Sequence, residues 1–260
     1  MKYYIVDAFA DELFTGNPAG VCLLEHDLPN EIMQKIAFEN NLAETAFLLQ
    51  KDRKFMLRWF TPEIEMDLCG HATLATAFVL MNYIDTTVKN IVFETQSGML
   101  TVVNENNIYT MDFPSRPPIC VDMPSSLEEA LGCKVLETHL SRDLLVLVEK
   151  ESDVQNLRPN FEMIKAINSS IGFAIIVTAK GERCDFVSRF FAPNAGVIED
   201  PVTGSAHSTL IPFWSERLHK TKMIARQLSQ RGGTLFCESA GDRVKIGGTA
   251  ICYLAGEIIV

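Results

Sequence analysis

A repeat of about half the chain length is the feature that most restricts how this sequence can fold. Arg58-Trp-Phe-Thr-Pro62 in the first half is matched by Arg189-Phe-Phe-Ala-Pro193, 131 residues later. Two further matches follow in the same order, each 134 residues apart: Gly70-His71-Ala72 with Gly204-Ser205-Ala206, and Gln96-Ser97-Gly98 with Gln230-Arg231-Gly232. In a chain of 260 residues, these offsets predict a duplicated unit. The alternative is two unrelated β-rich domains that share a common R-F-x-x-P pattern.

Short runs of β-branched and aromatic residues, separated by Gly, Asn, Asp or Pro, predict strands along both halves. The expected strands are 3–8, 20–24, 45–49, 55–60, 91–94, 100–104 and 108–113, then 144–149, 174–178, 184–191, 234–238, 243–246 and 250–259. Each half adds one apolar helix after its glycine motif, over 70–83 and 204–218. A helix that is apolar around most of its circumference has to be buried. We therefore expect an α+β fold of two pseudo-symmetric domains, each a mostly antiparallel β-barrel around a central helix.

The stretch 114–124 contains four prolines and is the most linker-like part of the chain. It predicts an N-terminal barrel domain over 1–115 and a C-terminal barrel domain over 116–260. Two amphipathic segments, 30–39 and 126–131, are expected as peripheral helices. Pro212 lies inside the second central helix and lacks a backbone N–H, so it is expected to kink that helix or to mark a later start.

Composition restricts the partners of the protein. With 23 Lys and Arg against 33 Asp and Glu, the formal charge is −10, and no basic cluster is present, which argues against nucleic acid. The most apolar stretch, 68–84, is too short and too polar for a membrane span. The seven cysteines form no C-x-x-C pair, and no secretory signal opens the sequence, so a reduced, cytoplasmic protein is expected. The five histidines lie far apart without ligand spacing, so no metal is expected.

The two glycine motifs predict a binding site for a small acid. Gly70 and Gly204 each stand at a strand-to-helix junction, where backbone N–H groups and the helix dipole favour a carboxylate or an enolate oxygen. We expect the two ends to converge on a cleft between the domains. His71, Ser205 and Asp200 are the polar side chains beside them. The alternatives are turn glycines without a ligand, and an Asp200 that only caps the helix.

Glu44 lies between an expected helix end and a strand start, beside Ala43, Ala46 and Phe47. Small and apolar surroundings suit a carboxyl that acts as a general acid/base near neutral pH. The alternative is a surface glutamate at the start of a strand, and composition alone favours that alternative.

Several motifs lie in order along nearly the whole chain: Val6-Asp7-Ala8-Phe9, Gly16-Asn17-Pro18-Ala19-Gly20-Val21-Cys22, Ala43-Glu44-Thr45, Asp67-Leu68-Cys69-Gly70-His71-Ala72-Thr73, Arg189-Phe190-Phe191-Ala192-Pro193, Glu199-Asp200-Pro201-Val202-Thr203-Gly204-Ser205-Ala206 and Val244-Lys245-Ile246-Gly247-Gly248-Thr249-Ala250. As a set they resemble the phenazine-biosynthesis PhzF-like isomerase family. The resemblance implies the fold of diaminopimelate epimerase and proline racemase, in which each domain is a barrel around a central helix. It also implies that the C-terminal strand, about 250–260, returns to the first domain.

The resemblance also implies an activity. Glu44 matches the family's acid/base glutamate, which moves a proton between two carbons of a dihydro-hydroxyanthranilate ring. His71, Asp200 and Ser205 match residues that hold the substrate and stabilise the shifted charge, and Gly70 and Gly204 match backbone donors. The implied protein is a cofactor-independent isomerase of a small carboxylate-bearing substrate, and a homodimer.

A departure from the racemase relatives restricts the mechanism. Those enzymes use two thiols, one at each helix start. Here the first of these positions holds Cys69, but the second holds Thr203. A threonine hydroxyl is far too weak a base near neutral pH, while a thiol titrates near about 8.5. The sequence therefore argues against two-thiol racemisation, and Cys69 is expected to be a small buried residue. The alternatives to the PhzF-like isomerase are a one-base epimerase or racemase of an amino or hydroxy acid, and a non-catalytic small-acid binding protein.

Overall fold

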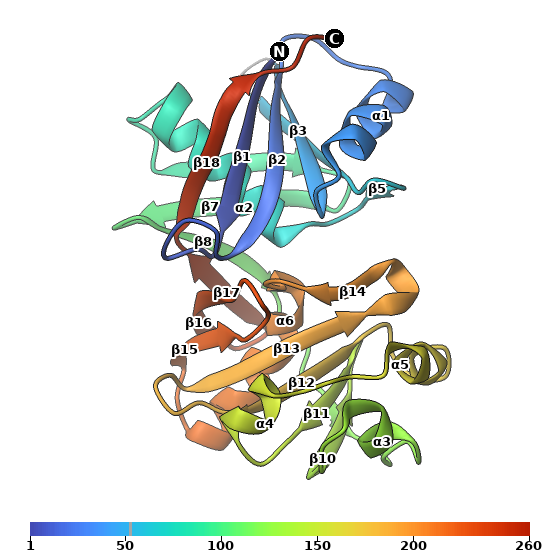
Figure 1. The fold of residues 1–260 in the computed structure, drawn as a ribbon. Helices are drawn as coiled ribbons and strands as arrows, with labels where there is room; N and C mark the ends of the chain where they lie inside the picture. The colour runs from blue at the N-terminus through green and yellow to red at the C-terminus, as the bar shows by residue number, and fades with distance from the viewer. Residues whose placement is uncertain (52–53) are drawn as a thin grey trace. The chain divides into compact units, whose positions relative to one another are not determined.

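The computed structural model describes residues 1–51 and 54–260 (Figure 1). The chain divides by its internal packing into two units. The first unit contains Met1–Asp112 together with Gly247–Val260, and the second contains Phe113–Ile246. No helix in the described part of the chain is long and apolar enough to cross a membrane.

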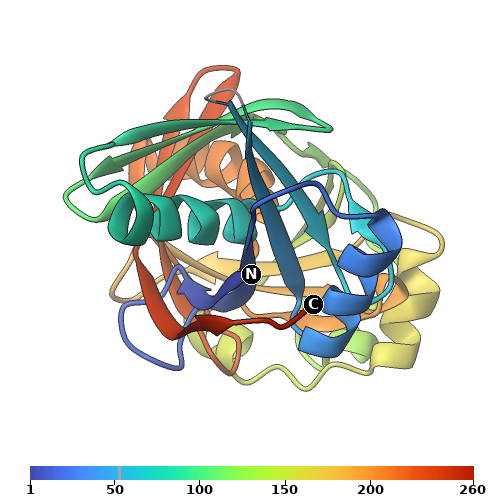
Figure 2. The same ribbon diagram turned by 90° about the horizontal axis from the view of Figure 1, so that it is seen from above.

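The first unit is built mainly of strands. Its elements, with β8 running two residues past the unit's end, are β1 (Lys2–Ala8), β2 (Asn17–Leu24), α1 (Asn30–Asn40), β3 (Glu44–Lys51), β4 (Lys54–Phe60), β5 (Glu65–Met66), α2 (Gly70–Val79), the π-helical turn η1 (Leu80–Ile84), β6 (Asn90–Thr95), β7 (Gly98–Glu105), β8 (Ile108–Pro114) and β18 (Ala250–Glu257). Strand β1 lies between β2 and β18 and is antiparallel to both. The Met1 amino group donates to the Ile258 carbonyl at 3.1 Å, so the two chain ends lie side by side (Figure 2).

The second unit has more helices at its edge. Its elements are β9 (Ile119–Cys120), α3 (Leu127–Leu131), β10 (Glu137–Leu140), β11 (Leu144–Leu147), α4 (Glu151–Gln155), α5 (Phe161–Asn168), β12 (Ile175–Lys180), β13 (Phe186–Ala192), the short η2 (Pro193–Ala195), β14 (Val197–Asp200), α6 (Gly204–Leu218), β15 (Lys222–Gln227), β16 (Gly233–Ala240) and β17 (Arg243–Gly248), the last of which ends in the first unit. An apolar cluster joins the peripheral helices to one side of β11, β12 and β13.

The two units repeat one order of strand pairings. In the first, β1 and β2 are antiparallel, β2 and β3 parallel, β3 and β4 antiparallel, β4 and β6 parallel, and β6 and β7 antiparallel. In the second, β10 and β11, β11 and β12, β12 and β13, β13 and β15, and β15 and β16 follow the same series. A central helix follows the short strand β5 in the first unit (α2) and the short strand β14 in the second (α6). The expected α+β class is confirmed.

The repeated R-x-F sequence has a structural reason in both units. Arg58 donates twice to the Glu65 carboxylate, at 2.7 Å each, and its guanidinium lies 5.2 Å from the centroid of the phenylalanine ring two residues on. Arg189 donates twice to Glu199, at 2.7 and 2.9 Å, and lies 5.1 Å from the corresponding ring. In each unit the arginine thus ties the long strand to the short strand that leads into the central helix.

The central helix of the first unit is buried along nearly its whole length. Its buried hydroxyls bond to the helix backbone: Thr73 donates to the Cys69 carbonyl at 2.6 Å and Thr76 to the Ala72 carbonyl at 2.7 Å. The hydroxyl groups of these two buried threonines therefore keep hydrogen-bond partners inside the apolar core. The helix was expected to run to residue 83, but it ends at Val79 and continues as a π-helical turn.

Pro212 lies inside α6, which nevertheless begins at Gly204, so the expectation of a later start is wrong. A proline cannot donate to the carbonyl four residues earlier. Here that carbonyl, on Ser208, accepts the backbone N–H of Arg116 at 2.9 Å. The proline-rich stretch therefore supplies the donor that Pro212 lacks.

Several elements of the second unit escaped the sequence prediction, among them β10, α4, α5 and β15. Two of them carry visible signals. Asn160 accepts the Met163 backbone N–H at 3.3 Å as the N-cap of α5, and β15 alternates exposed and buried residues along its length.

Candidate active site

The chain delivers Glu44 to the start of β3 by a sharp turn. Helix α1 ends at Asn40, and Asn41 takes a left-handed conformation with φ of 47°, which asparagine tolerates better than most residues. The Asn40 side chain then donates to the Thr45 hydroxyl at 3.3 Å. Because Glu44 is the first residue of the strand, its side chain is held at the strand end rather than in the middle of the sheet.

Two other segments meet Glu44 there. Cys69 is the N-cap residue of α2, and His71 lies in the first turn. Asn17 begins β2 after Gly16, whose φ of 72° and close approach to the Ala8 carbonyl leave no room for a side chain, since an added Cβ would lie 2.3 Å from that oxygen.

The His71 imidazole is the centre of the cluster. Its Nε2 lies 3.2 Å from Glu44 Oε2, an ion-pair distance whose angles do not make a hydrogen bond. Its Nδ1 lies 3.6 Å from Cys69 Sγ and 3.4 Å from the Asn17 side-chain nitrogen. The Glu44 side chain is 16% exposed and that of His71 is 7% exposed. The carboxylate is therefore the member of the cluster that a solute reaches most easily.

Burial and charge set the protonation of the cluster. Burial raises the pKa of the Cys69 thiol, and the Glu44 carboxylate adds to that effect, so the thiol stays neutral near neutral pH. Burial by itself would lower the pKa of His71, but the neighbouring Cys69 sulfur and Glu44 carboxylate outweigh it, and this pKa lies well above its ordinary value. The Cys69 sulfur and the Glu44 carboxylate together therefore keep the proton on His71.

The second unit holds the other predicted residues. Asp200 ends β14, Gly204 begins α6 and Ser205 follows it. Asp200 does not cap the helix, because Thr203 is the N-cap residue, and the Asp200 carboxylate instead accepts the Thr203 hydroxyl at 2.5 Å. The sequence analysis missed Gln227, a buried residue whose side chain hydrogen-bonds to this loop.

Gln227 makes three hydrogen bonds to the loop before α6. Its side-chain nitrogen donates to the Asp200 carbonyl at 2.7 Å and to the Thr203 hydroxyl at 3.1 Å, and its side-chain oxygen accepts the Thr203 N–H at 2.9 Å. The loop shape therefore depends on a side chain from β15, which no local sequence signal near residue 200 reveals.

The strand registers show which residues correspond between the units. Thr45 pairs with Phe60, and Ile175 pairs with Phe191, the residue that matches Phe60 in the repeat. Glu44 and Ala174 therefore take the same place, one residue before the paired position. At the helix starts, Cys69 corresponds to Thr203 and His71 to Ser205. The carboxylate, thiol and imidazole of the first unit thus have an alanine, a hydroxyl and a hydroxyl as counterparts in the second.

Three of these side chains could also hold a metal ion. One ligand atom each from Glu44, Cys69 and His71 lies within 4.8 Å of the others. The expectation of no metal relied on spacing along the chain, whereas this group forms because Glu44 comes from a different segment than Cys69 and His71. That expectation stays a prediction.

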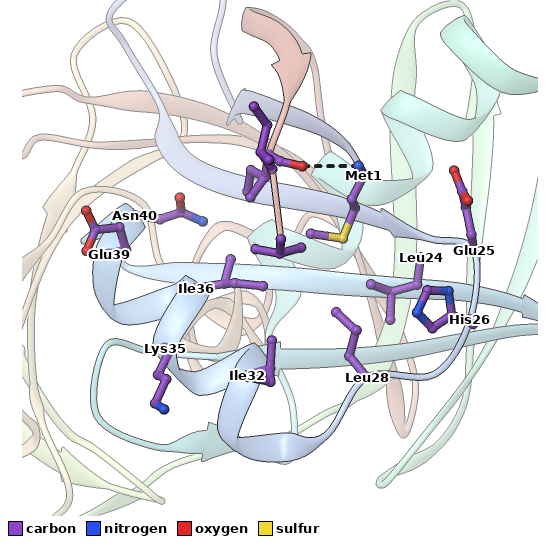
Figure 3. Close-up of a pocket in the computed structure, with 13 residues that line it drawn as sticks. Met1, Leu24, Glu25, His26, Leu28, Ile32, Lys35, Ile36, Glu39 and Asn40 are labelled. Atoms are coloured by element: carbon purple, nitrogen blue, oxygen red, sulfur yellow. Dashed lines mark hydrogen bonds between the residues drawn. The ribbon is translucent and has the colours of Figure 1, made fainter.

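A hollow of about 880 Å³ lies elsewhere in the first unit, between α1 and the C-terminal residues (Figure 3). Aliphatic side chains, among them Leu24, Ile32 and Ile36, line most of it. Among its described lining residues, no carboxylate is paired with a buried imidazole as Glu44 is paired with His71, so proton transfer fits the Glu44 cluster better than this hollow.

Comparison with known proteins agrees with the motifs. Residues 6–256 match the PhzC-PhzF family, described as phenazine biosynthesis-like protein. The chain belongs to this family. An uncharacterized isomerase of Pseudomonas aeruginosa is 48% identical over 258 residues, 99% of this chain and 98% of that protein. The crystal structure of a PhzF family protein of Enterococcus faecalis has a TM-score of 0.97 and 49% identity, covering 100% of this chain and 99% of that one.

This member of the PhzC-PhzF family is an isomerase, as three curated relatives that are 42–48% identical to it are named. A hydroxyproline epimerase of Agrobacterium vitis is 11% identical with a TM-score of 0.64, covering 98% of this chain and 91% of that one, so it shows a shared fold alone. The expected diaminopimelate epimerase-like fold is thereby confirmed. The roles of Glu44, Gly70, His71, Asp200, Gly204 and Ser205 stay predictions.

Proposed function

We propose that this PhzF-family isomerase moves a proton on a small carboxylate-bearing substrate with Glu44 as its single acid/base and without a cofactor. The observation that carries the proposal is the Glu44 carboxylate, partly open to solvent and 3.2 Å from a buried imidazole at the start of a helix. A carboxylate so placed can take a proton from carbon and return it to a neighbouring carbon on the same face.

The other predicted residues act on the substrate's charge. His71, with its raised pKa, supplies positive charge close to an enolate or carboxylate oxygen. Gly70 and Gly204 begin α2 and α6, and neither helix start is closed by a side-chain cap. Their backbone N–H groups are therefore suited to an anion. Asp200 and Ser205 complete the proposed set as a second polar group near the substrate.

The comparison of the two units favours one base over two. Racemisation through two faces needs a second base, and the second unit offers Ala174, Thr203 and Ser205 at the corresponding places. A hydroxyl does not ionise near neutral pH as a thiol or carboxylate does. One-base epimerisation of an amino or hydroxy acid is the second candidate, and it uses the same carboxylate. The cytoplasmic location expected from the cysteine pattern and the homodimer implied by the family resemblance both stay predictions.

The first test compares wild type with Glu44→Gln by proton NMR in heavy water, with trans-2,3-dihydro-3-hydroxyanthranilate and a panel of amino and hydroxy acids. We expect wild type to convert or exchange one of these compounds and Glu44→Gln to be slower by about 10²–10⁴-fold, the usual contribution of a general acid/base. Glu39→Gln, an exposed glutamate at the end of α1, is the matched control and should leave the rate unchanged.

Each alternative has its own outcome in this experiment. Exchange at a single α-carbon without movement of a double bond would indicate the one-base epimerase. Thermal stabilisation by a panel member without any exchange would indicate a binding protein. Equal rates in wild type and Glu44→Gln would overturn the role of Glu44.

A further inference from the structure

The geometry points to a second property of the Glu44 cluster. We propose that Glu44, Cys69 and His71 bind a thiophilic divalent cation of the zinc class, and that this ion inhibits the isomerase. The inhibitory part rests on the proposed function of Glu44, whereas the binding part does not.

The donor set suits zinc rather than magnesium or calcium. A thiolate, an imidazole and a carboxylate are the side chains that zinc sites combine, whereas magnesium and calcium take oxygen ligands. On binding, the Cys69 thiol gives its proton to solvent and its sulfur donates an electron pair to the ion. The oxidation state of the sulfur and of the metal does not change.

Distances within the cluster support this assignment. Cys69 Sγ and His71 Nδ1 lie 3.6 Å apart. Two ligands of one tetrahedral zinc ion, with bonds of roughly 2.3 Å to sulfur and 2.0 Å to nitrogen, are about 3.5 Å apart. The thiol and imidazole are thus already spaced as ligands of one ion.

Glu44 would supply the third ligand by rotation of its side chain. One of its oxygens lies within 4.8 Å of the donor atoms of both other residues, but the carboxylate now faces the opposite ring nitrogen of His71. Its side chain is 16% exposed against 7% for that of His71, so it can turn toward the ion. A carboxylate held by zinc cannot accept a proton from carbon, and this is the reason for inhibition.

The second unit provides an internal contrast. Its helix start carries Thr203 and Ser205, and Ala174 stands where Glu44 stands in the first unit. None of these three is a zinc ligand of the usual kind. One equivalent of metal per chain is therefore expected rather than two.

The test titrates the full-length protein, kept reduced and without substrate, with Co²⁺ as a spectroscopic probe and with Zn²⁺ against a chromogenic chelator. We expect one equivalent of Co²⁺ to give a thiolate-to-metal charge-transfer band. Cys69→Ser should remove the band and weaken Zn²⁺ binding at least tenfold. The matched control is Cys120→Ser, which removes an exposed thiol in the second unit and should change neither result.

Other results would overturn the site. A band that persists in Cys69→Ser, or one that disappears in Cys120→Ser, would place the metal at another thiol. If Cys69→Ser does not fold, as judged by circular dichroism, Cys69→Ala and His71→Ala give the same comparison. Absence of stoichiometric Co²⁺ and Zn²⁺ binding to wild type would overturn the proposal directly.

Inhibition is measured separately from binding. Zn²⁺ should stop the wild-type NMR reaction over the concentration range in which it binds, and a chelator should restore it. Reaction that continues at saturating Zn²⁺ would overturn the inhibitory role. A wild type that binds Zn²⁺ but acts on no substrate would count against the proposed function and leave the metal site supported.

Discussion

Helices α2 and α6 take the same place in two units with the same order of strands, but their first turns carry different chemistry. The first turn of α2 carries His71, whose pKa lies well above its ordinary value. Burial lowers this pKa, but the Cys69 sulfur and the Glu44 carboxylate raise it more. The first turn of α6 carries His207, which is fully buried and has its pKa lowered by that burial to about 4. The difference teaches that burial alone keeps a histidine neutral, and that acidic neighbours such as Cys69 and Glu44 are needed to charge it.

The largest expected difference between the units is the free energy of unfolding contributed by their arginine braces, the pairs Arg58–Glu65 and Arg189–Glu199. Arg189 pairs with Glu199 as Arg58 pairs with Glu65, but it also donates to the carbonyls of Val154 and Leu157, and its side chain is 11% exposed against 26% for Arg58. Arg189→Leu should lower the free energy of unfolding by about 3–5 kcal/mol, because it leaves a partly buried carboxylate and two carbonyls without their donor.

Arg58→Leu is the matched variant, and it should cost about 1–2 kcal/mol, because Arg58 is itself more exposed than Arg189 while the partner carboxylates are equally exposed at 21%. Urea unfolding of both variants measures the difference. Equal losses would show that the two braces are equivalent despite their different burial.

A smaller effect is expected from pH. His207 has a folded pKa of about 4, below its unfolded value of about 6.5. Its contribution to stability is therefore fully present above about pH 6.5 and is lost as the pH falls through 4. In His207→Gln this loss is absent, so between pH 7.5 and 4 the variant should gain about 2–3 kcal/mol relative to wild type.

The measurement is urea unfolding of wild type and His207→Gln across that pH range. His26→Gln, which replaces an exposed histidine of the first unit, is the control and should follow wild type. A His207→Gln curve parallel to that of wild type would mean that His207 titrates normally in the folded protein.

The smallest effect is expected at the C-terminal end of the central helix α2. Where α2 passes into its π-helical turn, the Asn82 side chain donates to the Phe78 carbonyl at 2.8 Å and to the Tyr109 hydroxyl at 2.6 Å. Asn82→Ala should lower the free energy of unfolding by about 0.5–1.5 kcal/mol, as for other exposed hydrogen bonds. Thermal unfolding beside Asn90→Ala, an exposed control on β6, checks this, and a loss no larger than the control's would contradict it.

The sequence by itself determined the repeat, the two buried helices and most of the strands. These features follow from local patterns, because apolar periodicity, β-branched runs and turn residues act over a few neighbouring positions. The helix-start motifs also pointed to His71 and the two glycines, whereas Glu44 was singled out by the family resemblance and not by its composition. Short elements such as β10 and α4 escaped the sequence prediction, because their few residues carry too weak a pattern.

Only the tertiary structure decided how those groups meet. Glu44 and His71 come from different segments, and the pairing of β2 with β3 beside α2 brings them together. Gln227 reaches the loop before α6 from another strand, and the donor for the carbonyl that Pro212 leaves open comes from Arg116. Such contacts depend on the register of strands far apart in the chain, and so do the charges of the two buried histidines, because a pKa depends on what the fold places beside the ring.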